Sequence, residues 1–320
     1  MNFLILNAGT RNELVKYFTQ SAKGKVVATD SYFLAPAIYE ADKHYVVNNT
    51  YDEVYVGRII DIAHQENIDC ILSLIDPELE FLAKNKEVFN SAGISVMIGD
   101  YNDVMLTFNK YMMYKQLSKF GISTIKTYDN LEDFDIDYNK KLINFPVFIK
   151  PVCGSGSQGI MKINDYPTLK ANYHNHLMII QEFMTGAEYG VDVYCDMSTH
   201  IAHSWFIKKK LKMRSGETDK SVSLHNSRID ELIMQLTQSF KFSGVIDVDI
   251  FEHNGKFFVS EINPRFGGGY LHAYACGMNY IDLLIADLEK KPTKKLDYLD
   301  EIYMMKFNSI MVKSKEELDE

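Results

Sequence analysis

The first hundred residues alternate short apolar runs with segments of helical periodicity. The apolar runs are FLIL, beginning at Phe3, followed by KVVATD, HYVV, CILSLI and ISVMIG. Amphipathic stretches such as DEVYVGRIIDIAHQEN separate them. Strands that alternate with helices form a mostly parallel sheet that is covered on both faces. We therefore predict a Rossmann-like α/β domain at the start of the chain.

Local signals place two helix starts in this part of the chain. Thr10 and Glu13 have the spacing of a capping box, in which the two side chains satisfy each other's free backbone amides. Asp76 followed by Pro77 is typical of an N-cap and a first helical turn. The sequence therefore predicts helices that begin just after Thr10 and just after Asp76.

The sequence does not favour a nicotinamide-binding function for this domain. Asp30 follows Gly9 by about the interval at which a dinucleotide-binding domain places its ribose-binding acid. However, the segment NAGTRN supplies one glycine where that fingerprint needs three. A structural α/β domain is the better interpretation.

The pattern changes after about residue 121, where apolar segments follow one another as paired strands. They read FPVFIKP, GIMKIN, MIIQEFM, YGVDVYC and HIAHSWFIKKK. A helix is predicted over Asp230–Phe240, then the strand pair VIDVDIF and KFFVSEIN, and a last helix over Tyr280–Leu288. This second part of the chain is therefore expected to have an α+β architecture.

A glycine-rich loop directly follows the first of these strands, in FPVFIKPVCGSGSQGI. It contains Gly154, Ser155, Gly156, Ser157 and Gly159. Such a loop can turn its backbone amides toward one point and so bind an anion. The P-loop pattern is absent, because no Lys-Ser or Lys-Thr follows the glycines. Taken alone, the loop fits a flexible hairpin tip equally well.

Acidic and amide side chains lie on the predicted strand pair of VIDVDIFEHNGKFFVSEINPRFGGG. Asp247 and Asp249 share one face of their strand, as do Glu261 and Asn263 on the next. Their oxygens suit Mg²⁺, which takes few protein ligands and leaves room for phosphate. Arg265 follows as a fixed cation for phosphoryl charge. The alternative is a solvated acidic edge, which the apolar neighbours make costly.

The strand pair can hold a cation only if its acids share one face. A two-residue turn at Asn254 and Gly255 would pair Asp249 with Ser260 and turn Glu261 away. The sequence therefore predicts a three-residue loop, His253 to Gly255, with Gly255 at positive φ forming a bulge.

Together these segments resemble the ATP-grasp superfamily, and most closely single-module relatives of the carbamoyl phosphate synthase large subunit. GTRNELV and LIDPELEFLA are similar to that family's front domain, and NKYMMYKQLSKFGI to its leading helix. The glycine loop, IIQEFMTGAEYGVDV and DVDIF…EINPRFGGG resemble its phosphate loop, adenine crossover and magnesium hairpin. The resemblance implies a front domain over 1–100, followed by a two-lobed ATP-grasp domain with a small lobe over 101–184 and a large lobe over 185–320.

The resemblance also implies the site residues. Lys110 and Lys150 would contact the ATP phosphates, under a lid made by Gly154, Ser155, Gly156, Ser157 and Gly159. Gln181, Glu182, Phe183 and Met184 would surround adenine, and Glu188 would bind the ribose. Asp249, Glu261 and Asn263 would hold Mg²⁺, or Mn²⁺ in its place. Arg265 and Lys150 would act on the transferred phosphoryl group, and Lys208 and Arg214 would contact a substrate anion.

The implied activity is that of an ATP-dependent carboxylate–amine ligase. A small-molecule carboxylate would be phosphorylated to an acyl phosphate, and an amine would then displace the phosphate. Two alternatives stay open: phosphorylation of bicarbonate or carbamate, as carbamoyl phosphate synthases do, and a sensor that binds ATP without turnover. The sequence does not identify the carboxylate or the amine.

Composition excludes several other functions. A formal charge of -9 gives no basic surface for nucleic acid, and no apolar stretch approaches the ~20 residues that span a membrane. The four cysteines are scattered without a metal-binding pair, which is typical of a reducing cytoplasm. The nine histidines show no metal-ligand spacing. The oligomeric state stays open.

Overall fold

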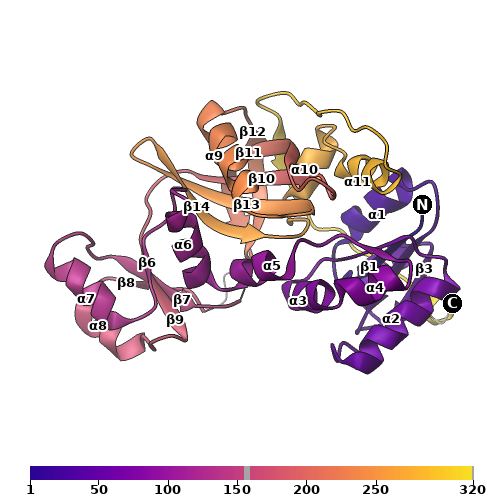
Figure 1. Ribbon diagram of the computed structural model, residues 1–320, viewed down its shortest axis with the longest axis horizontal. Coiled ribbons are helices and arrows are strands. Elements are labelled where there is room, and N and C mark those ends of the chain that lie inside the picture. The colour runs from indigo at the N-terminus through magenta and orange to yellow at the C-terminus, as the bar shows by residue number, and fades with distance from the viewer. Residues whose placement is uncertain (155–158, 319–320) are drawn as a thin grey trace.

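The computed structural model describes residues 1–154 and 159–318, which fold around three β-sheets. Figure 1 shows the N-terminal sheet with its helices at one end of the molecule and a small four-stranded sheet with two helices at the other. A larger six-stranded sheet lies between them. We refer to these parts as the N-terminal domain, the small lobe and the large lobe. Their boundaries near residues 100 and 184 stay predictions.

The N-terminal domain is a five-stranded parallel sheet in the order β3-β2-β1-β4-β5, which confirms the predicted α/β class. Its strands are β1 (Phe3–Leu6), β2 (Val26–Asp30), β3 (Lys43–Val46), β4 (Cys70–Ser73) and β5 (Ser95–Val96). Its helices are α1 (Asn12–Ser21), the 3-10 helix η1 (Pro36–Glu40), α2 (Glu53–Gln65), α3 (Asp76–Lys84) and α4 (Lys86–Ser91). Both faces of β1 are buried, Phe3 and Ile5 in one core and Leu4 and Leu6 in another, which explains its uninterrupted apolar sequence.

The strand order creates a crevice at the carboxyl end of β1. The chain leaves β1 toward α1 and β2 on one side, whereas β4 lies on the other side and leads into α3. Connections that diverge in this way leave an opening at the strand ends, where ligands of open α/β sheets bind. The residues that follow β1 and β4 are therefore placed to line a site.

A buried carboxylate holds the two loops beside this crevice together. Glu78, on α3, is fully buried and accepts hydrogen bonds from Asn7 Nδ2 at 2.7 Å, from Ser73 Oγ at 2.6 Å and from the hydroxyl of Tyr55. Burial raises the pKa of Glu78, and these three donors oppose the rise. The loops after β1 and β4 are thus fixed by a shared acceptor.

We expect Glu78→Gln to lower the free energy of unfolding by about 1–3 kcal/mol, because an amide nitrogen would replace a buried acceptor that faces hydrogen-bond donors. The matched control is Glu80→Gln on the exposed side of the same helix, which should change it by less than about 0.5 kcal/mol. Urea unfolding of both variants measures the difference. Equal stabilities would contradict the structural role given to Glu78.

The small lobe is an antiparallel sheet in the order β6-β9-β7-β8. Its strands are β6 (Thr127–Tyr128), β7 (Val147–Pro151), β8 (Met161–Ile163) and β9 (Met178–Glu182). The helices α7 (Leu131–Asn139) and α8 (Tyr166–Asn172) belong to this lobe, and α5 (Tyr101–Phe108) and α6 (Lys110–Lys119) lead into it. The core of the lobe includes Phe134, Ile149 and Leu169, so one face of the sheet is buried under the helices.

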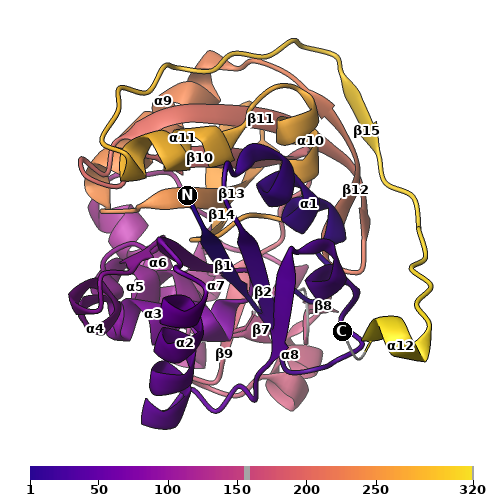
Figure 2. The same ribbon diagram turned by 90° about the vertical axis from the view of Figure 1, so that its right-hand side faces the viewer.

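The large lobe is an antiparallel sheet in the order β14-β13-β10-β11-β12-β15. Its strands are β10 (Glu188–Cys195), β11 (Ala202–Arg214), β12 (Glu217–Ser223), β13 (Gly244–His253), β14 (Lys256–Asn263) and β15 (Tyr303–Met305). Its helices are α9 (Ser227–Ser239), α10 (Tyr270–Ala275) and α11 (Tyr280–Leu288), and the short α12 (Lys315–Leu318) lies near the C-terminus. Figure 2 shows β15 continuing along the edge of this sheet toward α12 beside the N-terminal domain.

The N-terminal domain packs directly on the large lobe. One hydrophobic core contains Phe3 and Phe18 from the N-terminal domain together with Phe206 and Phe266 from the large lobe. The rings of Phe18 and Phe266 meet edge to face, with centroids 5.7 Å apart. Because this core is continuous, the crevice at the end of β1 has a fixed position against the larger sheet.

Both predicted helix starts differ from the observed ones by one residue. Helix α1 begins at Asn12 with Arg11 as its N-cap and no capping side chain, so the capping box of Thr10 and Glu13 is wrong. Glu13 instead pairs with Lys16 at 3.0 Å. Helix α3 begins at Asp76 itself, whose carboxylate pairs with Arg265 rather than capping the helix.

The predicted three-residue loop of the β13–β14 hairpin is also wrong. His253 pairs with Lys256, and the turn consists of Asn254 and Gly255 alone, at φ 50° and 71°. Asp249 still lies opposite Glu261, because Ile250 pairs with Val259 and Ser260 is left over as a bulge. Ser260, five positions after Gly255, is therefore the residue that puts Asp249 and Glu261 on one face of the sheet.

Within residues 1–154 and 159–318, we find no helix that combines the length and the apolar character needed to cross a bilayer.

Candidate active site

A cavity of about 630 Å³ lies where the three parts of the molecule meet. Its walls come from β7 and β9 of the small lobe, from β10, β11, β13 and β14 of the large lobe, and from the loop before α3. The structure brings together there ten side chains predicted from the sequence: Lys150, Gln181, Glu182, Phe183, Met184, Glu188, Asp249, Glu261, Asn263 and Arg265. The volume is within the usual range for a small-molecule site.

The predicted phosphate loop is described only at its ends. Gly154 and Gly159 both adopt positive φ, at 117° and 68°. Lys110, the first residue of α6, donates a hydrogen bond from Nζ to the carbonyl oxygen of Gly154. Ser155, Gly156 and Ser157 lie outside the described residues. Lys110 therefore lies beside the start of the loop, next to the cavity rather than among the residues that line it.

One end of the cavity is an apolar slot. Phe148 and Phe183 contact one another there with ring centroids 5.1 Å apart, and Ile125 and Met184 also line it. Gln181 lies beside the slot and donates from its amide nitrogen to Thr127 Oγ1 at 3.0 Å. The slot therefore has flat apolar walls and a few polar groups, as a planar heterocycle requires.

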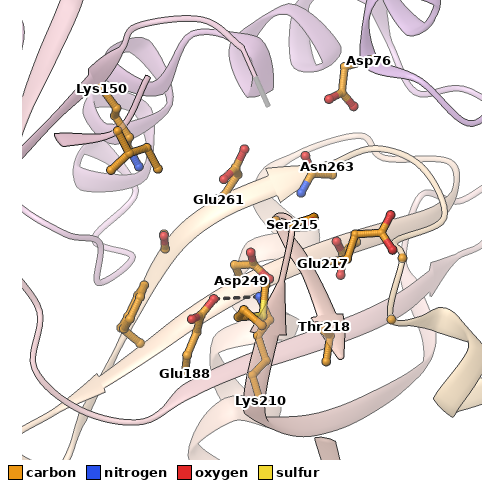
Figure 3. Close-up of a pocket in the computed structure, with 18 of the residues that line it drawn as sticks. Asp76, Lys150, Glu188, Lys210, Ser215, Glu217, Thr218, Asp249, Glu261 and Asn263 are labelled. Carbon is orange, nitrogen blue, oxygen red and sulfur yellow. Dashed lines mark hydrogen bonds and ion pairs between the residues drawn. The ribbon is translucent and has the colours of Figure 1, made fainter. Parts of the chain in front are cut away.

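The other end of the cavity gathers charge. Asp249 and Glu261 lie opposite one another on β13 and β14, and Lys150 extends toward them from β7 (Figure 3). Burial raises the pKa of Glu261, and the nearby Lys110 and Lys150 partly oppose the rise. Burial lowers the pKa of Lys150, with Glu261 opposing it. Glu261 and Lys150 thus lie in a region of low dielectric, where their charges interact strongly.

Lys210 is a central residue of the site that was not predicted from the sequence. Its Nζ lies 2.8 Å from Glu188 Oε1 and 2.6 Å from Asp249 Oδ1, and its side chain is 5% exposed. Burial lowers the pKa of Lys210, but the two carboxylates outweigh it and the net shift is upward. Alternation along the run KKKLK is the signal that could have revealed a lysine facing the acidic strands.

Lys208 and Arg214, predicted to contact a substrate anion, do not line this cavity. Lys208 is 1% exposed and forms an ion pair with the fully buried Asp192 beneath the cavity floor. Arg214 is 45% exposed and pairs with Asp219 at 3.0 Å. Side chains alternate between the two faces along β11, so Lys208 and Lys210 lie on the same face of the sheet. Of these two lysines, Lys210 lines the cavity and Lys208 does not.

Arg265 is held in place by an acid from the N-terminal domain. Its Nε and Nη2 bond the two carboxylate oxygens of Asp76 at 2.6 and 3.3 Å, and its Nη2 lies 3.5 Å from Asn263 Oδ1. Burial lowers the pKa of Arg265, but Asp76 outweighs it and raises the pKa. The two-oxygen contact fixes the plane of the guanidinium at the edge of the cavity.

The three glycines that follow Arg265 leave room for charged side chains. A Cβ on Gly267 would lie 2.4 Å from the carboxylate carbon of Asp247, and one on Gly268 would lie 2.7 Å from Arg11 Nη1. A Cβ on Gly269 would lie 2.5 Å from Cε of Lys208. The run of glycines therefore allows charged side chains to approach the backbone closely at three successive positions.

The donor set fits a hard divalent cation. Asp249, Glu261 and Asn263 offer oxygen ligands from adjacent strands on one face of the sheet. Within the described part of the chain, no three His, Cys, Asp or Glu side chains gather closely enough to hold a metal without other ligands. Two carboxylates and one amide would leave positions in the coordination shell of the cation that nucleotide phosphates could fill.

The comparisons with known proteins define the family. Residues 107–269, more than half of the chain, match the ATP-grasp domain family, and residues 3–97 match the family described as PylC-like, N-terminal domain. The chain therefore belongs to the ATP-grasp family, as its sequence motifs predicted.

Relatives are found over most of the chain at low identity. An uncharacterised protein of Methanocaldococcus jannaschii is 26% identical over 296 residues, which cover 83% of this chain and 68% of that protein. A formate-dependent phosphoribosylglycinamide formyltransferase of Wigglesworthia glossinidia brevipalpis is 20% identical over 279 residues, 82% of this chain and 68% of that protein.

Solved structures share the fold. The N5-carboxyaminoimidazole synthetase of Staphylococcus aureus complexed with ADP superposes with a TM-score of 0.77 at 17% identity, over 96% of this chain and 82% of that one. The L-amino acid ligase of Bacillus licheniformis gives a TM-score of 0.69 at 17% identity, over 92% of this chain and 75% of that one. At this level of identity, the similarity shows the fold alone.

The ion-pair network of the cavity should also contribute to stability. Lys210→Met removes the cation between Glu188 and Asp249, so we expect the free energy of unfolding to fall by about 3 kcal/mol or more. Lys212→Met, an exposed neighbour on the same strand, is the matched control and should be nearly neutral. Chemical denaturation at neutral pH measures both. A Lys210→Met protein as stable as the control would contradict the network.

Proposed function

We propose that this protein is an ATP-dependent carboxylate–amine ligase that works through an acyl phosphate. The observation that carries the proposal is the placement of Asp249, Glu261 and Asn263 in one cavity with Lys150 and Arg265. Oxygen ligands for a divalent cation, a buried lysine and a fixed guanidinium are what phosphoryl transfer requires, because such catalysis is mostly positioning and charge stabilisation.

The nucleotide would lie with adenine in the apolar slot between Phe148 and Met184. The amide nitrogen of Gln181 is engaged by Thr127, so its oxygen is the atom that would accept a hydrogen bond from the adenine amino group. The backbone at Glu182 and Met184 would bond the adenine edge. The carboxylate of Glu188 would accept hydrogen bonds from the ribose hydroxyls.

The phosphates would extend toward the charged end of the cavity. Lys150 and Lys110 would neutralise their oxygens, and the loop from Gly154 to Gly159 would cover them. Asp249, Glu261 and Asn263 would hold Mg²⁺, or Mn²⁺, which when bound would screen the phosphate charge. The cavity walls would exclude water from the reacting groups.

In the first step, an oxygen of the substrate carboxylate would attack the γ-phosphorus. An oxygen–phosphorus bond forms, the bond to the β–γ bridging oxygen breaks, and ADP leaves. In the second step, the nitrogen of the amine attacks the acyl carbon, and the carbon–oxygen bond to phosphate breaks. Inorganic phosphate leaves, and the nitrogen loses a proton to solvent or phosphate. Arg265, oriented by Asp76, would stabilise charge on the transferred group.

An interception experiment tests this chemistry. An acyl phosphate is an electrophile, so hydroxylamine supplied with ATP, Mg²⁺ and a suitable carboxylate should give a hydroxamate without the natural amine. ADP release should depend on the same carboxylate. Hydroxamate colour and ADP formation are measured across a panel of amino acids and small carboxylates, with ATP alone as the control.

The outcomes separate the alternatives. Carboxylate-dependent ADP and hydroxamate formation support the ligase. Carboxylate-dependent ADP without hydroxamate points to another phosphoryl acceptor, such as bicarbonate. Tight ATP binding with no acceptor-dependent ADP across the panel identifies a nucleotide sensor and overturns the proposal.

Glu261→Gln tests the metal-binding face separately. The substitution keeps the shape of the side chain and removes the charge that balances the cation, so we expect ATP turnover to fall ~10²-fold or more. Glu231→Gln on the exposed face of α9 is the matched control. Both variants are assayed for ADP release and melting temperature. Turnover near that of the control at an unchanged melting temperature would refute the role of Glu261.

A further inference from the structure

A second cavity, of about 520 Å³, adjoins the first at the crevice of the N-terminal domain. Arg11, Glu217 and Gly268 line both cavities and therefore form the wall between them. Arg11 lies in the loop that connects β1 to α1, at the carboxyl end of β1, where the strand order opens a ligand crevice.

The wall is a chain of ion pairs. Arg11 Nη1 lies 3.0 Å from Glu217 Oε1, and Lys306 Nζ lies 2.9 Å from Glu217 Oε2. Burial would raise the pKa of Glu217, but Arg11 and Lys306 outweigh it and lower the pKa, so this side chain is a carboxylate. Gly268 allows the approach, because a Cβ there would lie 2.7 Å from both Arg11 Nη1 and Glu217 Cδ.

The wall constrains the charge of any ligand that opens it. A simple anion bound to Arg11 would displace Glu217 and deprive that carboxylate of one of its cations. A simple cation bound to Glu217 would leave Arg11, whose side chain is 27% exposed, without its partner. A zwitterion replaces both charges at once, so no partly buried charge loses its counterion.

The rest of the second cavity combines apolar and charged side chains. Its charged members pair with one another, since Lys16 Nζ lies 3.0 Å from Glu13 Oε1 and 3.6 Å from Glu40 Oε1. Leu271 at the start of α10, Pro36 of η1 and Met311 of the C-terminal segment line it beside the ion pairs. A ligand that carries both charges at one end can therefore place an apolar group at the other end against Leu271 and Met311.

Building on the proposed ligase, we infer that the second cavity receives the amine substrate and that this substrate is an α-amino acid with an apolar side chain. Its carboxylate binds Arg11, its ammonium group binds Glu217, and its side chain lies against Leu271 and Met311. Because Glu217 also lines the first cavity, the amino nitrogen is held at the opening toward the phosphoryl site.

Blocked ligands test each charge on the unmodified protein. The full chain, with ADP and Mg²⁺, is titrated calorimetrically with leucine, methionine and phenylalanine, with their amides, which lack the carboxylate, and with their N-acetyl forms, which lack the ammonium group. We expect the free amino acids to bind at least about tenfold more tightly than either blocked form, since each block removes a charge-assisted contact.

Two variants assign the contacts. Arg11→Gln should bind the free amino acid no better than its amide, and Glu217→Gln should bind it no better than its N-acetyl form. Arg58→Gln, an exposed arginine on α2, is the matched control and should keep both differences. Affinity for ADP and melting temperature are measured alongside.

The inference is overturned if no amino acid in the panel binds, if blocked and free forms bind equally, or if both wall variants keep the preferences of the control. These results differ from failure of the ligase proposal. A non-amino-acid amine that yields an amide with ADP release would leave the ligase intact and remove the amino-acid site. Absence of acceptor-dependent ADP would refute the ligase whatever the second cavity binds.

Discussion

The structure depends on the balance of buried charge along the sheet that lines the first cavity. Asp192, Asp247 and Asp249 face one side of the large sheet, and burial together with Asp249 raises the pKa of Asp247 to about 7. Buried carboxylates are costly unless cations compensate them. Lys208 pairs with Asp192 and Lys210 with Asp249, so the lysines of β11 are the counterpart of the acids on β10 and β13. This balance keeps acidic residues together on a face that can receive a cation.

The same principle joins the N-terminal domain to the large lobe. Asp76 pairs with Arg265, and Arg11 pairs with Glu217. The N-terminal domain therefore supplies the acid in the first ion pair and the base in the second. The shared apolar core around Phe18 and Phe266 sets the distance over which these pairs form. The N-terminal domain therefore contributes charged groups to the first cavity and, through Arg11, to the wall between the two cavities.

The sequence predicted those features that depend on local pattern. The alternating strands and helices predicted the parallel sheet, and strand periodicity placed the acids of the hairpin on one face. The family resemblance, rather than local pattern, pointed to Phe183 and Met184, which line the same cavity. The sequence did not predict those features of the site that depend on contacts between distant segments. Lys210 lies between the acids because β11 is next to β10 in the sheet. The second cavity exists because the segment with Lys306 returns to Glu217, the partner of Arg11. The hairpin turn was wrong because a bulge at Ser260, which no local signal marks, corrects the register.

Transfer of oxygen from substrate to phosphate tests the central claim most directly. If the carboxylate attacks the γ-phosphorus, a carboxylate labelled with ¹⁸O must pass one labelled oxygen to inorganic phosphate when the amine displaces it. Mass spectrometry of the phosphate formed during amide synthesis measures this transfer. The account predicts one ¹⁸O per phosphate, at the enrichment of the carboxylate. Amide formation with unlabelled phosphate would contradict an acyl phosphate intermediate.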